Sequence, residues 1–211
     1  MKKLLLIAAG LSFAASVFAQ GTIVFNNRLT GSLVTHVYYN PAVNSSVIGN
    51  GANDTPAGTT SWAGYTALDG SGFMATLRCA SGAGVDPTLL QWAGATTTFR
   101  SGAGAGFING TTLTLPNVAK DAAAATFQMF AWDNRSGNYG TAAAAFSAWQ
   151  AGTIAAGFSN PFNVTKIGGD FNTPPNMDGL QSFNIYTVPE PSSLALAGLG
   201  AAAMLIFRRR K

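Results

Sequence analysis

Three residue types that carry much of protein chemistry are almost missing from this sequence of 211 residues. It has one cysteine, Cys79, one histidine, His36, and one glutamate, Glu190. A single cysteine excludes an intramolecular disulfide, so the packing of the core must hold the protein together. One histidine and one cysteine cannot form a zinc site of the usual His/Cys composition, and we expect neither a metal nor a cofactor.

Charged residues are also scarce, at 9% of the sequence, and many of them lie at its two ends. The formal net charge of +4 comes from these ends, which carry Lys2, Lys3, Arg208, Arg209, Arg210 and Lys211. The body between these ends contains six cationic residues and seven aspartates, so its net charge is near −1 with histidine neutral. Such a body offers no electrostatic footprint for a phosphate backbone, so we exclude nucleic-acid binding.

The length leaves room for one globular domain between two address segments, at roughly 100 to 200 residues per domain. The N-terminal segment has the three parts of a secretory signal: Lys2 and Lys3, an apolar run from residue 4 to 15, and small residues that end at Ala19. We expect signal peptidase to cut between Ala19 and Gln20. A buried N-terminal helix is the alternative. The domain is then expected over residues 20–187 and a sorting tail over residues 188–211.

The C-terminal segment has a proline motif, an apolar run and a basic end, in that order. Pro189, Glu190 and Pro191 precede an uncharged run over residues 194–207, and Arg208, Arg209, Arg210 and Lys211 follow it. This order resembles the PEP-CTERM sorting signal. The resemblance implies recognition by exosortase, a membrane-embedded cysteine transpeptidase, in bacteria that make exopolysaccharide. It covers only about the last two dozen residues.

Elementary physics of the same segment favours a transient membrane stop. The two prolines favour an extended strip that a processing enzyme can grip. The basic end is expected to stay in the cytoplasm, which places the motif on the outer side of the inner membrane. A membrane helix over about residues 192–207 has a fully apolar part that rises only ~21 Å, less than the roughly 30 Å hydrocarbon core. A permanent C-terminal anchor is the alternative.

Short apolar or alternating runs, separated by Asn-Gly, Asp-Gly and Gly-Gly turns, fill the body. This pattern predicts an all-β domain, a single antiparallel, jelly-roll-like β-sandwich. One run alternates clearly: it predicts a strand with Phe73, Ala75, Leu77 and Cys79 on its buried face. Residues 141–150 depart from the β pattern and predict one short helix, with Thr141 as its N-cap. We expect the strands at residues 22–25, 33–39, 73–79, 89–92, 96–100, 111–115, 126–132, 162–166 and 182–186.

Candidate catalytic and metal-binding residues are few. Cys79 and His36 could form a nucleophile and base, but a core thiol and a strand histidine are the simpler interpretation. Asp133 and Asp170 each neighbour an aromatic residue and are the aspartates hardest to assign to turns. Residues 133–138 carry alternating oxygen-bearing side chains, yet Arg135 within them argues for a hairpin turn rather than a calcium loop.

Three functions are consistent with these residues, and we rank them. We expect a surface or extracellular-matrix protein with a structural or adhesive role and no enzymatic activity. The alternative is a carbohydrate-binding module for exopolysaccharide, in which Trp62 and Tyr65, in a glycine-rich stretch, stack on sugar rings. A hydrolase is a third interpretation, which needs two aspartates that converge in a pocket. The expected location is the surface or matrix of a Gram-negative-type bacterium, after transient anchoring in the inner membrane.

Overall fold

The computed structural model describes residues 20–189. The predicted signal peptide and the part of the sorting tail from Glu190 onward lie outside the described residues. The strands are β1 (Gly21–Phe25), β2 (Arg28–Leu29), β3 (Leu33–Val34), β4 (Val37–Tyr39), β5 (Thr66–Ala67), β6 (Phe73–Ser81), β7 (Gln91–Trp92), β8 (Thr97–Thr98), β9 (Thr111–Leu115), β10 (Ala124–Asp133), β11 (Ala155–Phe158), β12 (Phe162–Thr165) and β13 (Phe183–Thr187). The helices are α2 (Ala142–Gln150) and two 3₁₀ turns, η1 (Pro87–Leu89) and η2 (Gly102–Gly104).

The long strands β6 and β10 form the centre of the fold. They pair antiparallel over nine residue pairs, from Ala125 opposite Ser81 to Asp133 opposite Phe73. Around them a nine-stranded sheet runs in the order β5-β4-β13-β11-β10-β6-β7, with β12 also paired to β10 and β8 to β6. All these pairs are antiparallel except β4 with β13, which is parallel. The ribbons β1–β9 and β2–β3 are separate two-stranded sheets.

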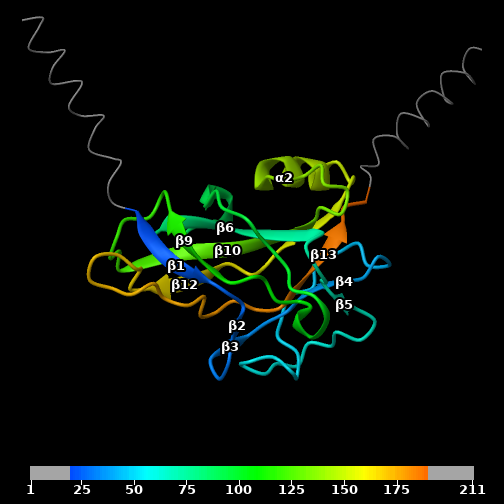
Figure 1. The fold of residues 1–211 in the computed structure, drawn as a ribbon, viewed down its shortest axis with the longest axis horizontal. Coiled ribbons are helices and arrows are strands. Elements are labelled where there is room, and N and C mark those ends of the chain that lie inside the picture. Colours follow the sequence, from blue (N-terminus) through cyan, green and yellow to red (C-terminus); the bar gives the residue numbers. More distant parts are fainter. Residues whose placement is uncertain (1–19, 190–211) are drawn as a thin grey trace, which may run out of the picture.

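Both faces of β10 are buried because its side chains alternate between two layers. Phe127 and Met129 point into the main core, where they meet the β1–β9 ribbon through residues such as Ile23. Phe130 and Trp132 point to the opposite face, which α2 covers. Each such fully buried side chain contributes about 1.5–3 kcal/mol to stability through the hydrophobic effect. In Figure 1, β1 and α2 accordingly lie on different sides of the β6–β10 pair.

Helix α2 is rich in alanine, and its two larger side chains face the sheet, where they complete an aromatic cluster with residues of β10. Thr141 caps the helix, since its side-chain oxygen accepts the N–H of Ala144 at 3.3 Å. Phe146 and Trp149, one turn apart, both pack against the cluster. Trp149 also donates its indole N–H to the carbonyl of Tyr186 in β13, at 2.8 Å. The helix is thereby fastened to the last strand of the domain.

The predictions of an all-β domain and of one short helix capped by Thr141 are confirmed. Cys79 and its neighbours on β6 line the core, as the alternation predicts. Three details were wrong. The sheet contains one parallel pair, and the second layer is a two-stranded ribbon rather than the full second sheet of a jelly-roll-like sandwich. The expected strand over residues 33–39 is also broken at Thr35 and His36, where the backbone N–H of His36 binds a side chain instead of a neighbouring strand.

Candidate functional site

The histidine lies in a hydrogen-bonded cluster that joins three segments distant in sequence. His36 is in the break between β3 and β4, Asp54 is in the loop between β4 and β5, and Ser182 directly precedes β13. His36 Nδ1 and Asp54 Oδ1 are 2.6 Å apart, and Ser182 Oγ donates to Asp54 Oδ2 at 2.9 Å. The backbone N–H of His36 in turn donates to Ser182 Oγ at 2.7 Å. The two side chains enclose the carboxylate, and the bond to Ser182 occupies the His36 N–H that a continuous strand would use in its ladder.

Asp54 is a buried carboxylate with a full set of donors. Only 1% of its side chain is exposed, and the backbone N–H of Gly51 supplies a further hydrogen bond at 2.6 Å. Burial by itself raises the pKa of this carboxyl. The hydrogen bonds from His36, Gly51 and Ser182, with the attraction of His36, outweigh burial and lower the pKa overall. Asp54 is therefore ionised at neutral pH.

The order of the groups differs from that of a catalytic triad. In a Ser-His-Asp triad the imidazole stands between the other two and takes the proton of the serine. Here Asp54 stands in the middle, and the hydroxyl of Ser182 donates to the carboxylate instead of to the ring of His36. The geometry fixes chain segments and does not activate Ser182 as a nucleophile.

A column of aromatic rings extends from the cluster. The ring centroid of His36 lies 4.4 Å from that of Phe107 and 5.6 Å from that of Tyr38. Tyr38 stacks on Trp62 at 4.4 Å and 22°, and Tyr65 meets Trp62 edge-on at 5.1 Å and 87°. Burial and, second, the charge of Asp54 raise the pKa of Tyr38 to about 12, so its hydroxyl stays protonated.

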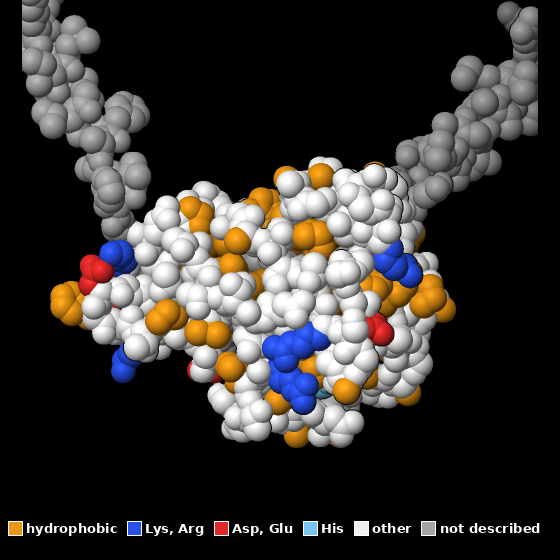
Figure 2. Space-filling view, in the orientation of Figure 1, with side chains coloured by type: hydrophobic (Ala, Val, Ile, Leu, Met, Phe, Trp, Pro, Cys, Tyr) orange, Lys and Arg blue, Asp and Glu red, His pale blue; other side chains and the backbone are white. Residues whose placement is uncertain are grey.

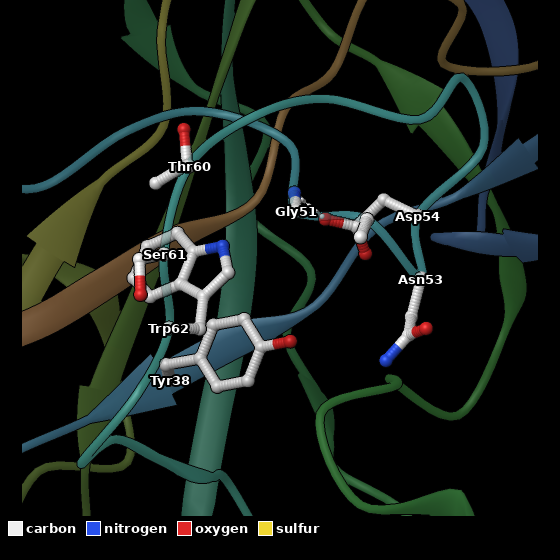
Figure 3. A pocket seen from close by; sticks show the side chains of 8 residues that line it. Tyr38, Gly51, Asn53, Asp54, Thr60, Ser61 and Trp62 are labelled. Atoms are coloured by element: carbon white, nitrogen blue, oxygen red, sulfur yellow. Dashed lines mark hydrogen bonds between the residues drawn. The ribbon is translucent and has the colours of Figure 1, made fainter.

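A hollow of about 420 Å³ opens beside this column. Figure 3 shows the stacked rings of Tyr38 and Trp62 on one side of it, and Asn53 and Asp54 on the other. The dashed line in Figure 3 marks the hydrogen bond from the backbone N–H of Gly51 to the Asp54 carboxylate, within this lining. The lining is completed by Ala52, Thr60 and Ser61. Apart from Asp54, whose two oxygens are already hydrogen-bonded, the lining is uncharged.

Trp62 and Tyr65, the residues proposed to stack on sugars, do lie together, but they contact each other. Both are only partly exposed. Trp62 is stacked on Tyr38, and its indole N–H donates to the carbonyl of Gly49 at 3.2 Å. Tyr38 therefore covers one face of Trp62, and the ring of Tyr65 meets Trp62 edge-on.

The other candidates from the sequence have structural partners. Cys79 is fully buried opposite Phe127, burial raises the pKa of its thiol to about 11, and no hydrogen bond joins it to His36. A thiol of this kind is unreactive in the folded protein. The structure therefore does not bring together the pair of nucleophile and base.

The two singled-out aspartates form ion pairs with neighbouring cations. Asp133 accepts hydrogen bonds from the guanidinium of Arg135, and Asp170 accepts one from Lys120 at 2.7 Å. Within residues 133–138, the side-chain oxygen of Asn134 accepts the N–H of Tyr139, as in a turn. Residues 20–189 contain no group of three or more histidine, cysteine, aspartate or glutamate side chains placed to hold a metal ion.

Sequence reasoning missed Asp54 and Ser182. Asp54 lies between Asn53 and a Thr-Pro pair in a stretch rich in glycine, proline and asparagine, where an aspartate is expected simply to form a turn. Its partners are 18 and 128 residues away along the chain. The only available signal was the presence of a single histidine, which gives no indication of a partner.

The domain ends where the predicted sorting motif begins. Strand β13 stops at Thr187, and the exposed Pro189 is the last described residue. Residues 187–211 match the family model of the PEP-CTERM protein-sorting motif. No curated protein and no solved structure matches the chain. Within the described part, none of the helices has the length and apolar character needed to cross a membrane.

Proposed function

We propose that this chain is an exosortase-sorted protein of the cell surface or extracellular matrix of a Gram-negative-type bacterium, whose domain has a structural or adhesive, non-catalytic role. The observation that carries the proposal is the PEP-CTERM match over residues 187–211. Such a motif implies export, a transient stay in the inner membrane and processing by exosortase. Signal peptidase is the expected enzyme at the other end, between Ala19 and Gln20.

The side chains of the domain support a structural role. His36 and Ser182 are hydrogen-bonded around Asp54, while Asp133 and Asp170 are neutralised by cations. The cluster around Asp54 and the pair of Asp170 with Lys120 each join segments that are far apart in sequence, whereas the pair of Asp133 with Arg135 lies within one turn. Sugar stacking by Trp62 and Tyr65 has less support, because Tyr38 occupies a face of Trp62.

Replacing Glu190 tests the sorting step. Because Glu190 is the charged group of the motif, Glu190→Ala is expected to leave full-length protein in the inner membrane. Cell fractionation with mass spectrometry of the C-terminus measures this, and Ser192→Ala, next to the motif, is the matched control. Processed protein from the wild type should begin at Gln20. If the Glu190→Ala protein reaches the surface with its tail removed, the sorting proposal is wrong.

A further inference from the structure

Two arginines of the domain have neither a carboxylate partner nor a hydrogen bond from their terminal guanidinium nitrogens among residues 20–189: Arg28 and Arg100. The other two are engaged. Arg135 pairs with Asp133, and Arg78 donates to the carbonyls of neighbouring loop residues. In a domain with so few charges, a guanidinium that has free donors and no carboxylate partner is available to an external anion.

These two arginines, remote in sequence, meet at one short segment. The guanidinium carbon of Arg28 lies 4.7 Å from the centroid of the Phe107 ring. Arg100 donates its backbone N–H to the carbonyl of Phe107 at 2.8 Å and its Nε to the carbonyl of Ile108 at 3.0 Å. The His36 ring contacts the same phenylalanine. Figure 2 shows Lys and Arg side chains gathered into one patch near the middle of the visible face, with the edge of a histidine beside it.

The fold holds both guanidinium groups in place and leaves donors free. Phe107 is almost fully buried, and the exposed Arg28 lies over its ring. A Cβ on Gly104 would lie 2.8 Å from the Cβ of Arg100, so the glycine-rich loop packs directly against the stem of that arginine. Within the described domain, the terminal nitrogens of Arg100 and the guanidinium of Arg28 have no hydrogen-bond partner. Planar guanidinium groups bind carboxylates through two parallel hydrogen bonds.

The surroundings indicate which kind of anion fits. Two guanidinium groups in a domain near −1 are too few for a nucleic-acid backbone, and an anionic membrane surface attracts clusters of about 4–8 cations. The aromatic column leads from Phe107 through His36 and Tyr38 to the hollow, whose lining offers the amide of Asn53 and the hydroxyl of Ser61. A chain of sugar rings with carboxylates fits these groups, because its carboxylates would meet the guanidinium groups and its hydroxyl groups would meet the polar side chains of the hollow.

We propose that Arg28 and Arg100 form a binding site for the carboxylate groups of an acidic polysaccharide, a chain that contains uronic acids. The two guanidinium groups bind carboxylates, and the neighbouring hollow accepts the hydroxyl groups of an adjacent sugar. This inference rests on the surface role proposed above, for which it names a partner. Sorting is tested by fractionation of cells and the site by purified protein, so the two can fail separately.

The test measures binding of uronate tetramers by calorimetry to the full chain in a mild non-ionic detergent at low salt. The probes are tetramers of galacturonate, mannuronate, guluronate and glucuronate, each with its carboxyl-reduced, neutral counterpart. At least one uronate should bind, and its reduced form should not. Because a hydrogen bond to a charged group contributes at least about a factor of ten in affinity, Arg28→Ala and Arg100→Ala should each weaken binding about tenfold.

Two variants separate the site from general charge and from folding. Lys166→Asn removes an exposed cation elsewhere, at a residue with φ 55°, a conformation that asparagine tolerates, and should leave binding unchanged. The double variant Arg28→Lys with Arg100→Lys keeps the charge and loses the planar fork, so it should bind more weakly, and a thermal melt checks that it is fully folded at the temperature of the binding experiment. The proposal is overturned if no uronate binds, if the reduced tetramers bind equally well, or if Lys166→Asn weakens binding as much as the arginine variants.

Discussion

Asp54 and Asp121 serve the same purpose in two different environments. Each is a loop aspartate whose carboxylate holds chain segments that are far apart in sequence. Asp54 binds His36, Gly51 and Ser182 in the interior, whereas Asp121 accepts the backbone N–H groups of residues 170, 171 and 172 at 2.7 to 3.3 Å on the surface.

The comparison teaches that hydrogen-bond geometry alone does not determine the contribution to stability. The pKa of both carboxyls is lowered. At Asp121 the largest effect is the hydrogen bond from the N–H of Asn172, which burial opposes less strongly and to which the N–H groups of Asp170 and Phe171 add. At Asp54 burial is the largest single effect on the pKa, and only the hydrogen bonds together with the attraction of His36 outweigh it. Water can replace a lost partner of Asp121, but it cannot reach the donors around Asp54, which would stay unsatisfied.

The largest effect is expected for Asp54→Asn. The amide nitrogen that replaces one carboxylate oxygen faces either the donors that bind Oδ2 or Nδ1 of His36, which can accept from it only in the tautomer with the proton on Nε2. In both orientations the cluster loses the carboxylate charge. Breaking a buried, charged cluster of this kind costs about 3–5 kcal/mol, so the free energy of unfolding should fall by that amount in urea titrations. Asp121→Asn is the matched control. Equal losses in the two variants would show that burial is not what separates these sites.

An acid titration sharpens the same comparison. The pKa of Asp54 is lower in the folded than in the unfolded protein, where it is near 3.9, so its stabilising contribution is complete above that value. It is lost as pH falls through the folded pKa. The difference in unfolding free energy between wild type and Asp54→Asn should therefore stay constant from pH 7 to about pH 5 and then shrink in more acidic solution. A difference that grows on acidification would mean that the pKa of Asp54 is raised.

The smallest effect is expected for Asp121→Asn. Asparagine tolerates the positive φ of 54° at this position and keeps one oxygen acceptor, but it loses the second acceptor and the charge. Hydrogen exchange of the amides of residues 170–172 should therefore become faster, while exchange in β6 and β10 stays as in the wild type. Faster exchange throughout the sheet would show that this surface carboxylate supports the whole fold.

The parts of the fold that follow local rules could be predicted from the sequence. β9 has the predicted bounds and β10 extends the predicted strand by a few residues, because apolar alternation and flanking turns define them. β11 was missed, since its Ala-Ala-Gly-Phe sequence has little β propensity. It is a strand because β13 approaches so closely that a Cβ on Gly157 would lie 2.3 Å from the carbonyl oxygen of Asn184. Such a requirement exists only in the assembled sheet.

The candidate sites were harder to predict than the strands, for the same reason. Burial of Cys79 and the turn role of residues 133–138 follow from neighbouring residues and were expected. The pairing of His36 with Asp54, and the meeting of Arg28 with Arg100 at Phe107, depend on contacts between segments that no local pattern links. Composition indicated how few reactive groups there are, and tertiary contacts decided what each of them does.

The position of β13 in the sheet sets the moment at which this protein can complete its fold. β13 lies between β11 and β4, so the edge formed by β4 and β5 joins the rest of the sheet only through the last strand of the domain. A chain that crosses a membrane from its N-terminus exposes Thr187 only after everything before it has crossed, and residue 187 is also where the sorting match begins. For a chain exported N-terminus first, as proposed above, the sheet can be completed only when the sorting segment begins to arrive, so the domain would be whole only once translocation has reached the residues of the sorting match.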